Sequence, residues 1–325
     1  MNENQLIFLI SQPRSGSSLT QQLLLNSKSI TSSPESWQML SLIHTYKQTN
    51  IIDGYNPNYA SINFLDYLNN IDHGLDTFKQ QIKDLALKLY AYNTNADCYF
   101  LDKTPRYYHI INELYELFPQ AKFVFLVRNP LSVFASILDH NFKGNYVKFL
   151  SSKDRVEDLF TAPVEIDKAL KTYNNKILVK YEDLIENPEQ ELLKVFNYLE
   201  LELPQDVETY KVKDTFSNTE AIDTKSLKKH SKPSDSYLNS WKKTINNTQK
   251  KKLALDYIEA LSIKHVDYFG YDLKDLSNKL RAFRPEKRTL INLSLNSLIC
   301  EDAQLPFIRL LKKRIILKLQ GNHYV

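Results

Sequence analysis

The chain has 325 residues, of which 42% are hydrophobic and 25% are charged, a balance typical of globular proteins. A net charge of only +4 argues against a general nucleic-acid-binding protein, and no apolar run approaches the ~20 residues of a membrane-spanning helix. Two cysteines without a Cys-X-X-Cys spacing argue against a disulfide framework and a common zinc site. Because the N-terminus also lacks a signal-peptide pattern, we expect a cytoplasmic protein.

Short apolar segments alternate with helical patterns along the chain. Strands are predicted at residues 5–10, 97–101, 122–127 and 176–181. Helices are predicted at residues 17–27, 35–46, 76–92, 106–118, 131–140, 189–200 and 247–265. This order predicts an α/β fold with a P-loop-like parallel sheet and helices on both faces.

Three segments lack a clear pattern. Residues 47–75 and 141–175 contain turn residues and weak periodicity, so we expect insertions that shape an acceptor site. Residues 211–235 are polar and basic, which is typical of a lid loop.

The sequence "QPRSGSSL" at residues 12–19 joins the first predicted strand to the first predicted helix. A helix N-terminus offers free N–H groups and a positive dipole end, so this junction is a candidate anion site. Gly16 is one of only six glycines and stands where the backbone must turn tightly. The alternative is an ordinary strand-to-helix turn with Ser17 as N-cap.

The strand at 122–127 ends in Arg128, whereas a nucleotide kinase would carry an acidic metal ligand in that region. The first loop also lacks the Gly-Lys pair of GxxxxGK[ST]. An arginine attracts a second anion, so the sequence predicts an anion site that works without a metal. None of the seven histidines has metal-ligand spacing. Ser136 lies eight residues after Arg128, about two turns into the following predicted helix, and can point back toward the strand end. The alternative is that Arg128 caps a helix and Ser136 is an ordinary helical serine.

These motifs, in this order, resemble the PAPS-dependent sulfotransferases, in particular bacterial and carbohydrate-type members with an Arg-Ser-Gly loop. PAPS is 3′-phosphoadenosine 5′-phosphosulfate. The resemblance covers roughly residues 5–270, so it implies a sulfotransferase domain at 1–270 and a basic C-terminal extension at 271–325. The segments that carry it are "PRSGSSL", "LDKTPRYY", "FVFLVRNPLSVFAS", "LVKYEDLIENPEQELLKVFNYLEL" and "SDSYLNSWKK".

The resemblance implies three groups of donor-binding residues. The 5′-phosphosulfate would be held by Arg14, Ser15, Gly16, Ser17 and Ser18. Arg128 and Ser136 would hold the 3′-phosphate, which distinguishes PAPS and its product PAP from ATP, and Tyr181 would contact the adenine. An aromatic side chain packed at the sheet edge is the alternative for Tyr181.

Sulfuryl transfer depends on positioning and on charge stabilisation in the transition state. Arg14 cannot donate a proton, so its catalytic role would be electrostatic, and Lys103 would approach the sulfonate from the other side. Glu35 is the candidate general base, because it follows Arg14 by 21 residues, as in tyrosylprotein sulfotransferases. The alternatives are a solvated loop lysine at position 103 and a helix start at Ser33-Pro34-Glu35. Asp102 is a weaker candidate base.

The predicted function is therefore transfer of a sulfuryl group from PAPS to an acceptor hydroxyl. A carbohydrate is the first choice of acceptor. A P-loop NTP-dependent kinase and a non-catalytic PAP-binding module remain as alternatives. Residues 281–325 hold nine Lys/Arg and three Asp/Glu, and 305–319 have helical spacing. A basic amphipathic helix there would either contact an anionic membrane surface peripherally or dock on the domain.

Overall fold

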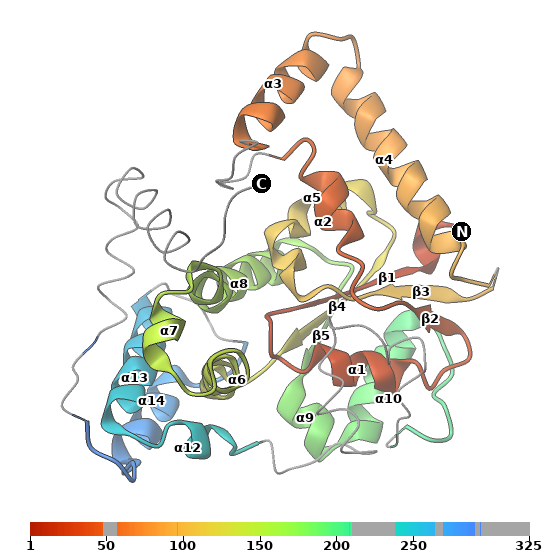
Figure 1. Cartoon of the computed structure of the whole chain (residues 1–325). Helices are drawn as coiled ribbons and strands as arrows, with labels where there is room; N and C mark the ends of the chain where they lie inside the picture. Colours follow the sequence, from red (N-terminus) through yellow and green to blue (C-terminus); the bar gives the residue numbers. More distant parts are fainter. Residues whose placement is uncertain are drawn as a thin grey trace.

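The computed structural model describes residues 1–47, 57–95, 97–207, 209, 238–263, 269–289 and 293. Its centre is a parallel five-stranded sheet with the order β2-β3-β1-β4-β5 (Figure 1). The strands are β1 (Leu6–Ser11), β2 (Ile30–Ser32), β3 (Tyr99–Asp102), β4 (Lys122–Val127) and β5 (Ile177–Lys180).

The predicted α/β fold is confirmed, with helices between consecutive strands. The N-terminal half contains η1 (Glu3–Gln5), α1 (Ser17–Leu24), α2 (Gln38–Ile43), α3 (Pro57–Asn69), α4 (Gly74–Ala91), η2 (Pro105–His109) and α5 (Ile111–Leu117). The remaining described helices are α6 (Pro130–Phe142), α7 (Tyr146–Leu150), α8 (Lys153–Thr172), α9 (Tyr181–Glu186), α10 (Pro188–Leu199), α12 (Trp241–Thr244), α13 (Thr248–Ile263) and α14 (Leu273–Ala282).

Both faces of the sheet are buried, which explains why the strands read as continuous apolar runs. In β1, Phe8 and Ile10 join one core cluster, whereas Ile7 and Leu9 join another on the opposite face. Helices α1, α9 and α10 cover the second face, and α2, α4 and α5 lie on the other side of the sheet (Figure 1).

The arrangement of β1 and β4 positions the site. The two strands are neighbours, but α1 packs on one face of the sheet and α6 on the other. In open α/β sheets, ligands bind beyond the carboxyl ends of the strands where the connections diverge in this way. The loops that follow β1 and β4 therefore meet at the expected binding edge.

One predicted helix start is wrong. The helix expected from residue 35 begins at Gln38, because Trp37 takes a left-handed conformation with φ 55°. Glu35 therefore precedes the helix and is not a helix-start residue. The helix predicted from residue 17 does begin at Ser17, and Gly16, with φ 98°, is its N-cap, so the alternative that made Ser17 the N-cap is wrong.

Residues 153–172, expected to belong to an insertion, form the long helix α8, and Leu159, Phe160 and Ile166 are buried in the main core. Pro163 within this helix had weakened its sequence pattern. A short strand, β2, had no prediction because it has three residues and only its first is apolar.

The C-terminal region is described only in part. Leu276 and Leu280 of α14 belong to the main core, so this part of the expected extension packs on the domain. The expected domain boundary at residue 270 stays a prediction. The predicted lid at 211–235 and the helix at 305–319 lie outside the described residues. No helix in the described ranges has the length and apolar character needed to cross a membrane.

Candidate active site

The loop between β1 and α1 has an unusual backbone. Arg14 and Gly16 take positive φ values of 70° and 98°, and the Ser15 N–H donates to the Gln12 carbonyl over 3.2 Å. A Cβ atom on Gly16 would lie 2.3 Å from the Tyr181 ring. Position 16 therefore requires glycine for two reasons, its conformation and its contact with Tyr181.

The structure brings the two predicted anion-binding loops together. The Arg14 Nε donates to the Ser136 Oγ over 3.1 Å, and the Arg128 Nη1 donates to the Arg14 carbonyl over 3.1 Å. Ser136 lies in α6, which Asn129 caps by accepting a hydrogen bond from the Leu131 N–H. Two arginines from adjacent strand ends thus lie at one place, and the loop around them is tied to α6.

Tyr181, the first residue of α9, packs at the same place. Its ring centroid lies 4.2 Å from the guanidinium carbon of Arg128, and the ring contacts Gly16. Tyr181 is only 5% exposed. In the structure, Tyr181 supports the loop around Gly16 and the side chain of Arg128. Contact of Tyr181 with an adenine stays a prediction.

Lys103 and Glu35 form an ion pair at the neighbouring strand end. The Lys103 Nζ lies 2.5 Å from the Glu35 Oε1 and 3.4 Å from the Ser18 Oγ. Lys103 is 1% exposed, so the solvated-lysine alternative is wrong. Burial lowers the pKa of Lys103, and Glu35 opposes this shift. Lys103 therefore connects the candidate base to the first loop.

Asp102, the weaker candidate base, has a different environment. Its Oδ2 accepts hydrogen bonds from the Tyr90 hydroxyl over 2.5 Å and from the Tyr107 hydroxyl over 2.7 Å. Burial raises the pKa of Asp102, and the two tyrosine hydrogen bonds oppose the shift. A carboxylate enclosed by two hydroxyls supports the core beneath the site, which leaves Glu35 as the accessible carboxylate beside Lys103.

Two groups of supporting residues were missed in the sequence. The Glu182 Oε1 accepts from the Asn129 N–H over 3.1 Å, and the Tyr271 hydroxyl also donates to Glu182. This contact ties the described C-terminal region to the loop after β4. A glutamate directly after Tyr181 in "KYEDL" was the only sequence signal.

The second group lies at the loop after β1. The Gln12 Nε2 donates to the backbone carbonyl of Asp158 over 3.0 Å. The buried Asp158 carboxylate accepts from the Arg106 Nη2 over 3.1 Å and from the Tyr108 hydroxyl over 2.8 Å. Because α8 was not predicted, its role in holding the loops could not be predicted either.

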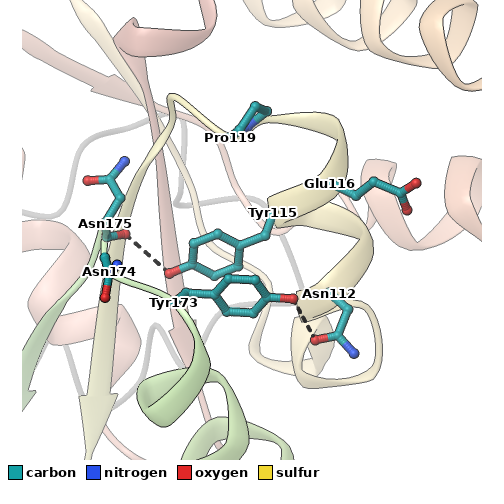
Figure 2. A pocket seen from close by; sticks show the side chains of 7 residues that line it. All are labelled: Asn112, Tyr115, Glu116, Pro119, Tyr173, Asn174 and Asn175. Atoms are coloured by element: carbon teal, nitrogen blue, oxygen red, sulfur yellow. Dashed lines mark hydrogen bonds between the residues drawn. The ribbon is translucent and has the colours of Figure 1, made fainter.

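A separate surface pocket lies away from these residues. Figure 2 shows its side chains, which precede β4 and β5 and so belong to the opposite edge of the sheet. Tyr115 and Tyr173 stack there with ring centroids 3.7 Å apart. None of the predicted site residues is among those that line it, which are Asn112, Tyr115, Glu116, Pro119, Tyr173, Asn174 and Asn175.

The structure is that of an α/β protein with a parallel sheet, in which two arginine-bearing loops form a candidate anion site where the connections of β1 and β4 diverge. The chain belongs to the sulfotransferase family, whose profile matches residues 6–205. This match includes every one of the predicted site residues.

The known proteins that are similar to the chain include a curated relative and a solved structure. Nodulation protein NoeE of Sinorhizobium fredii (strain NBRC 101917 / NGR234) is 28% identical over an alignment of 215 residues that covers 58% of this chain and 48% of that protein. The chain thus spans about half the length of this curated relative. The solved sulfotransferase domain from the curacin biosynthetic pathway is 20% identical, with a TM-score of 0.53 over 85% of this chain and 95% of that domain. This second likeness supports the fold.

Proposed function

We propose that the protein transfers a sulfuryl group from PAPS to an acceptor hydroxyl. The observation that carries the proposal is the meeting of Arg14 and Arg128, from two strand ends, beside the Lys103–Glu35 pair. Three cationic side chains at one binding edge suit a ligand with several negative charges.

The residues present fit a nucleotide with two separate phosphate groups. The Ser15 Oγ is fully buried and has no hydrogen-bond partner among the described residues. Gly16 leaves the backbone open where a Cβ would not fit. Arg14 to Ser18 would hold the 5′-phosphosulfate, and Arg128 with Ser136 the 3′-phosphate. When bound, PAPS supplies the sulfuryl group and a nucleotide leaving group.

The Lys103–Glu35 pair has two functions in this proposal. Glu35 accepts the proton of the acceptor hydroxyl, as a general base must. Lys103 donates a hydrogen bond to the Glu35 Oε1, which fixes the orientation of the carboxylate. Arg14 contributes fixed positive charge beside Lys103, where negative charge develops during the reaction.

The acceptor in this proposal is a carbohydrate hydroxyl. Its support is the resemblance of the Arg-Ser-Gly loop to carbohydrate-type sulfotransferases. Glu35 suits such an acceptor, because an alcohol has a high pKa and needs a base to remove its proton.

Calorimetry with PAP and ADP, each with and without EDTA, tests the donor. We expect PAP to bind much more tightly than ADP, and EDTA to change neither affinity. Equal affinity for the two nucleotides would overturn the proposal. Dependence on Mg²⁺ would favour a kinase, and PAP binding without turnover over a broad acceptor panel would favour a non-catalytic module.

A further inference from the structure

Trp37 is an exposed aromatic residue beside the candidate base. It follows Glu35 by two residues and is 41% exposed, whereas the second tryptophan, Trp241, is 6% exposed and packs on Phe283. Single exposed apolar residues are common on proteins, so exposure alone carries no inference. Two further features distinguish Trp37.

The first feature is the backbone. Trp37 takes the left-handed conformation with φ 55°, which bulky side chains rarely adopt. The conformation ends the segment that contains Glu35 immediately before α2 begins at Gln38. The chain thus turns sharply at a residue that keeps a large ring in contact with solvent.

The second feature is a cation that holds the ring. The guanidinium carbon of Arg106 lies 5.9 Å from the Trp37 ring centroid, within the range of a cation–π contact. Arg106 itself donates to Asp154 over 2.9 Å and to Asp158 over 3.1 Å. The indole ring therefore has a partner that is itself held by two carboxylates.

These contacts connect the ring to the segments that carry Glu35 and Lys103. Trp37 and Arg106 touch each other, and they follow Glu35 and Lys103 by two and three residues respectively. Glu35 and Lys103 are themselves in contact at 2.5 Å. Two contacts thus join the same two short segments, so the segment that carries the carboxylate also carries an exposed aromatic ring.

We propose that Trp37 is a stacking platform for a pyranose ring of the acceptor, an inference that rests on the function proposed above. One face of a pyranose presents C–H groups that pack on an aromatic ring, while its hydroxyls point outward from the ring edge. Trp37 supplies rigid contact area of this kind at low entropic cost. A long lipid chain would instead require an enclosed apolar groove.

Intrinsic fluorescence gives a direct test, because the chain contains only two tryptophans. In a Trp241→Phe variant of the full-length protein, Trp37 is the sole reporter. With PAP bound, we titrate methyl β-D-glucopyranoside, methyl β-D-galactopyranoside and cellobiose. Saturable changes with these probes, and none with the open-chain polyol sorbitol, are expected. No saturable change with any of the three pyranosides would overturn the inference.

Kinetics with the best sugar acceptor provides the second measurement. Trp37→Ala should raise the KM for the acceptor about tenfold or more with little change in kcat, and Trp37→Phe should restore most of the loss. PAP affinity should be unchanged in both variants. An unchanged KM in Trp37→Ala would contradict the platform, whereas failure of PAP to bind the wild-type protein would contradict the proposed function itself. A preference for phenols over pyranosides would overturn the sugar assignment.

Discussion

Lys103 and Glu35 come from two different βα junctions, yet the Lys103 Nζ lies 2.5 Å from the Glu35 Oε1. The side chain of Lys103 is fully buried and that of Glu35 is 12% exposed. The pair therefore joins an interior cation to a carboxylate that can still meet a substrate. This geometry makes Glu35 the residue to test first.

Glu35→Gln should lower turnover by about 10²- to 10⁴-fold, because the amide cannot accept the acceptor proton. PAP affinity should be retained, since Glu35 belongs to the acceptor side. Steady-state rates and PAP calorimetry measure the two effects. The matched control is Glu200→Gln, which removes another lysine-paired carboxylate, 2.7 Å from the Lys122 Nζ, at the opposite end of the sheet. Near wild-type turnover in Glu35→Gln would show that another residue is the base.

Deprotonation of Lys103 should lower the activity of the enzyme at alkaline pH. Burial lowers the pKa of Lys103 from the ordinary value of 10.5, so Lys103 loses its proton at a lower pH than a surface lysine. We expect kcat/KM to decline with rising pH at a midpoint below pH 10.5. Lys103→Arg should shift this decline to higher pH, because arginine keeps its charge. An identical pH profile in the variant would rule out titration of Lys103 as the cause.

The same shift predicts the pH dependence of stability. Between the lowered pKa of Lys103 in the folded state and 10.5, the unfolded state binds more protons. The contribution of Lys103 to the free energy of unfolding therefore rises with pH in that window. Urea unfolding of wild type and Lys103→Met should show this rise in the wild type alone.

Arg128 should carry the recognition of the 3′-phosphate. Its Nη1 bonds to the Arg14 carbonyl and its guanidinium stacks on Tyr181, so its position is fixed in the absence of a ligand. Arg128→Ala should weaken PAP binding by about 10- to 100-fold, the usual effect of losing a charged hydrogen-bond partner. Binding of AMP, which lacks the 3′-phosphate, should change much less. An equal loss for PAP and AMP would contradict the assignment and would indicate general damage to the loop.

Gly16→Ala should disrupt the first loop, because its Cβ would meet the Tyr181 ring at 2.3 Å and φ is 98°. We expect a loss of more than about 1 kcal/mol in the free energy of unfolding together with a large loss of PAP affinity. Gly144→Ala is the control. Position 144 also has a positive φ of 75°, but its new Cβ would meet only the flexible end of Lys250.

The control should therefore lose some stability and keep its PAP affinity. Denaturant unfolding and PAP calorimetry separate the two outcomes. If both alanine variants bind PAP as the wild type does, the loop around Gly16 is not the donor site.

His109 should contribute to acid sensitivity. Burial, followed by the nearby positive charges of Arg106 and Lys47, lowers the pKa of His109 to about 4 from an ordinary 6.5. As the pH falls from 6.5 to about 4, the unfolded state binds a proton that the folded state does not, so stability falls. The upper limit of the loss is about 3 kcal/mol, and partial solvent exposure of His109 makes it smaller.

His109→Gln should flatten this acid dependence, and the control His73→Gln, at an exposed surface position, should not. Urea unfolding across the same pH range makes the comparison. Equal slopes in the wild type and His109→Gln would show that other groups cause the acid sensitivity.

Local sequence features determined the α/β class, four of the five strands, and the three junctions that carry Arg14, Lys103 and Arg128. Strand runs and turn residues depend on short-range physics, namely burial on both faces and permitted φ values. The order of the motifs indicated the sulfotransferase family, because several motifs that are weak singly become specific when they occur in the family's order. Glycine at position 16 was recognisable for the same local reason.

Only the tertiary structure decided which of these residues meet. The contact of Lys103 with Glu35 joins residues 68 positions apart, and that of Arg14 with Ser136 joins residues 122 apart. Such pairs depend on the strand order and on which face each helix covers, information that no local window contains. The same applies to Tyr181, whose ring contacts both Gly16 and Arg128, and to Arg106, which contacts Trp37. Burial then shifted the pKa values of Lys103 and Asp102, because these side chains are desolvated only when distant segments pack over them.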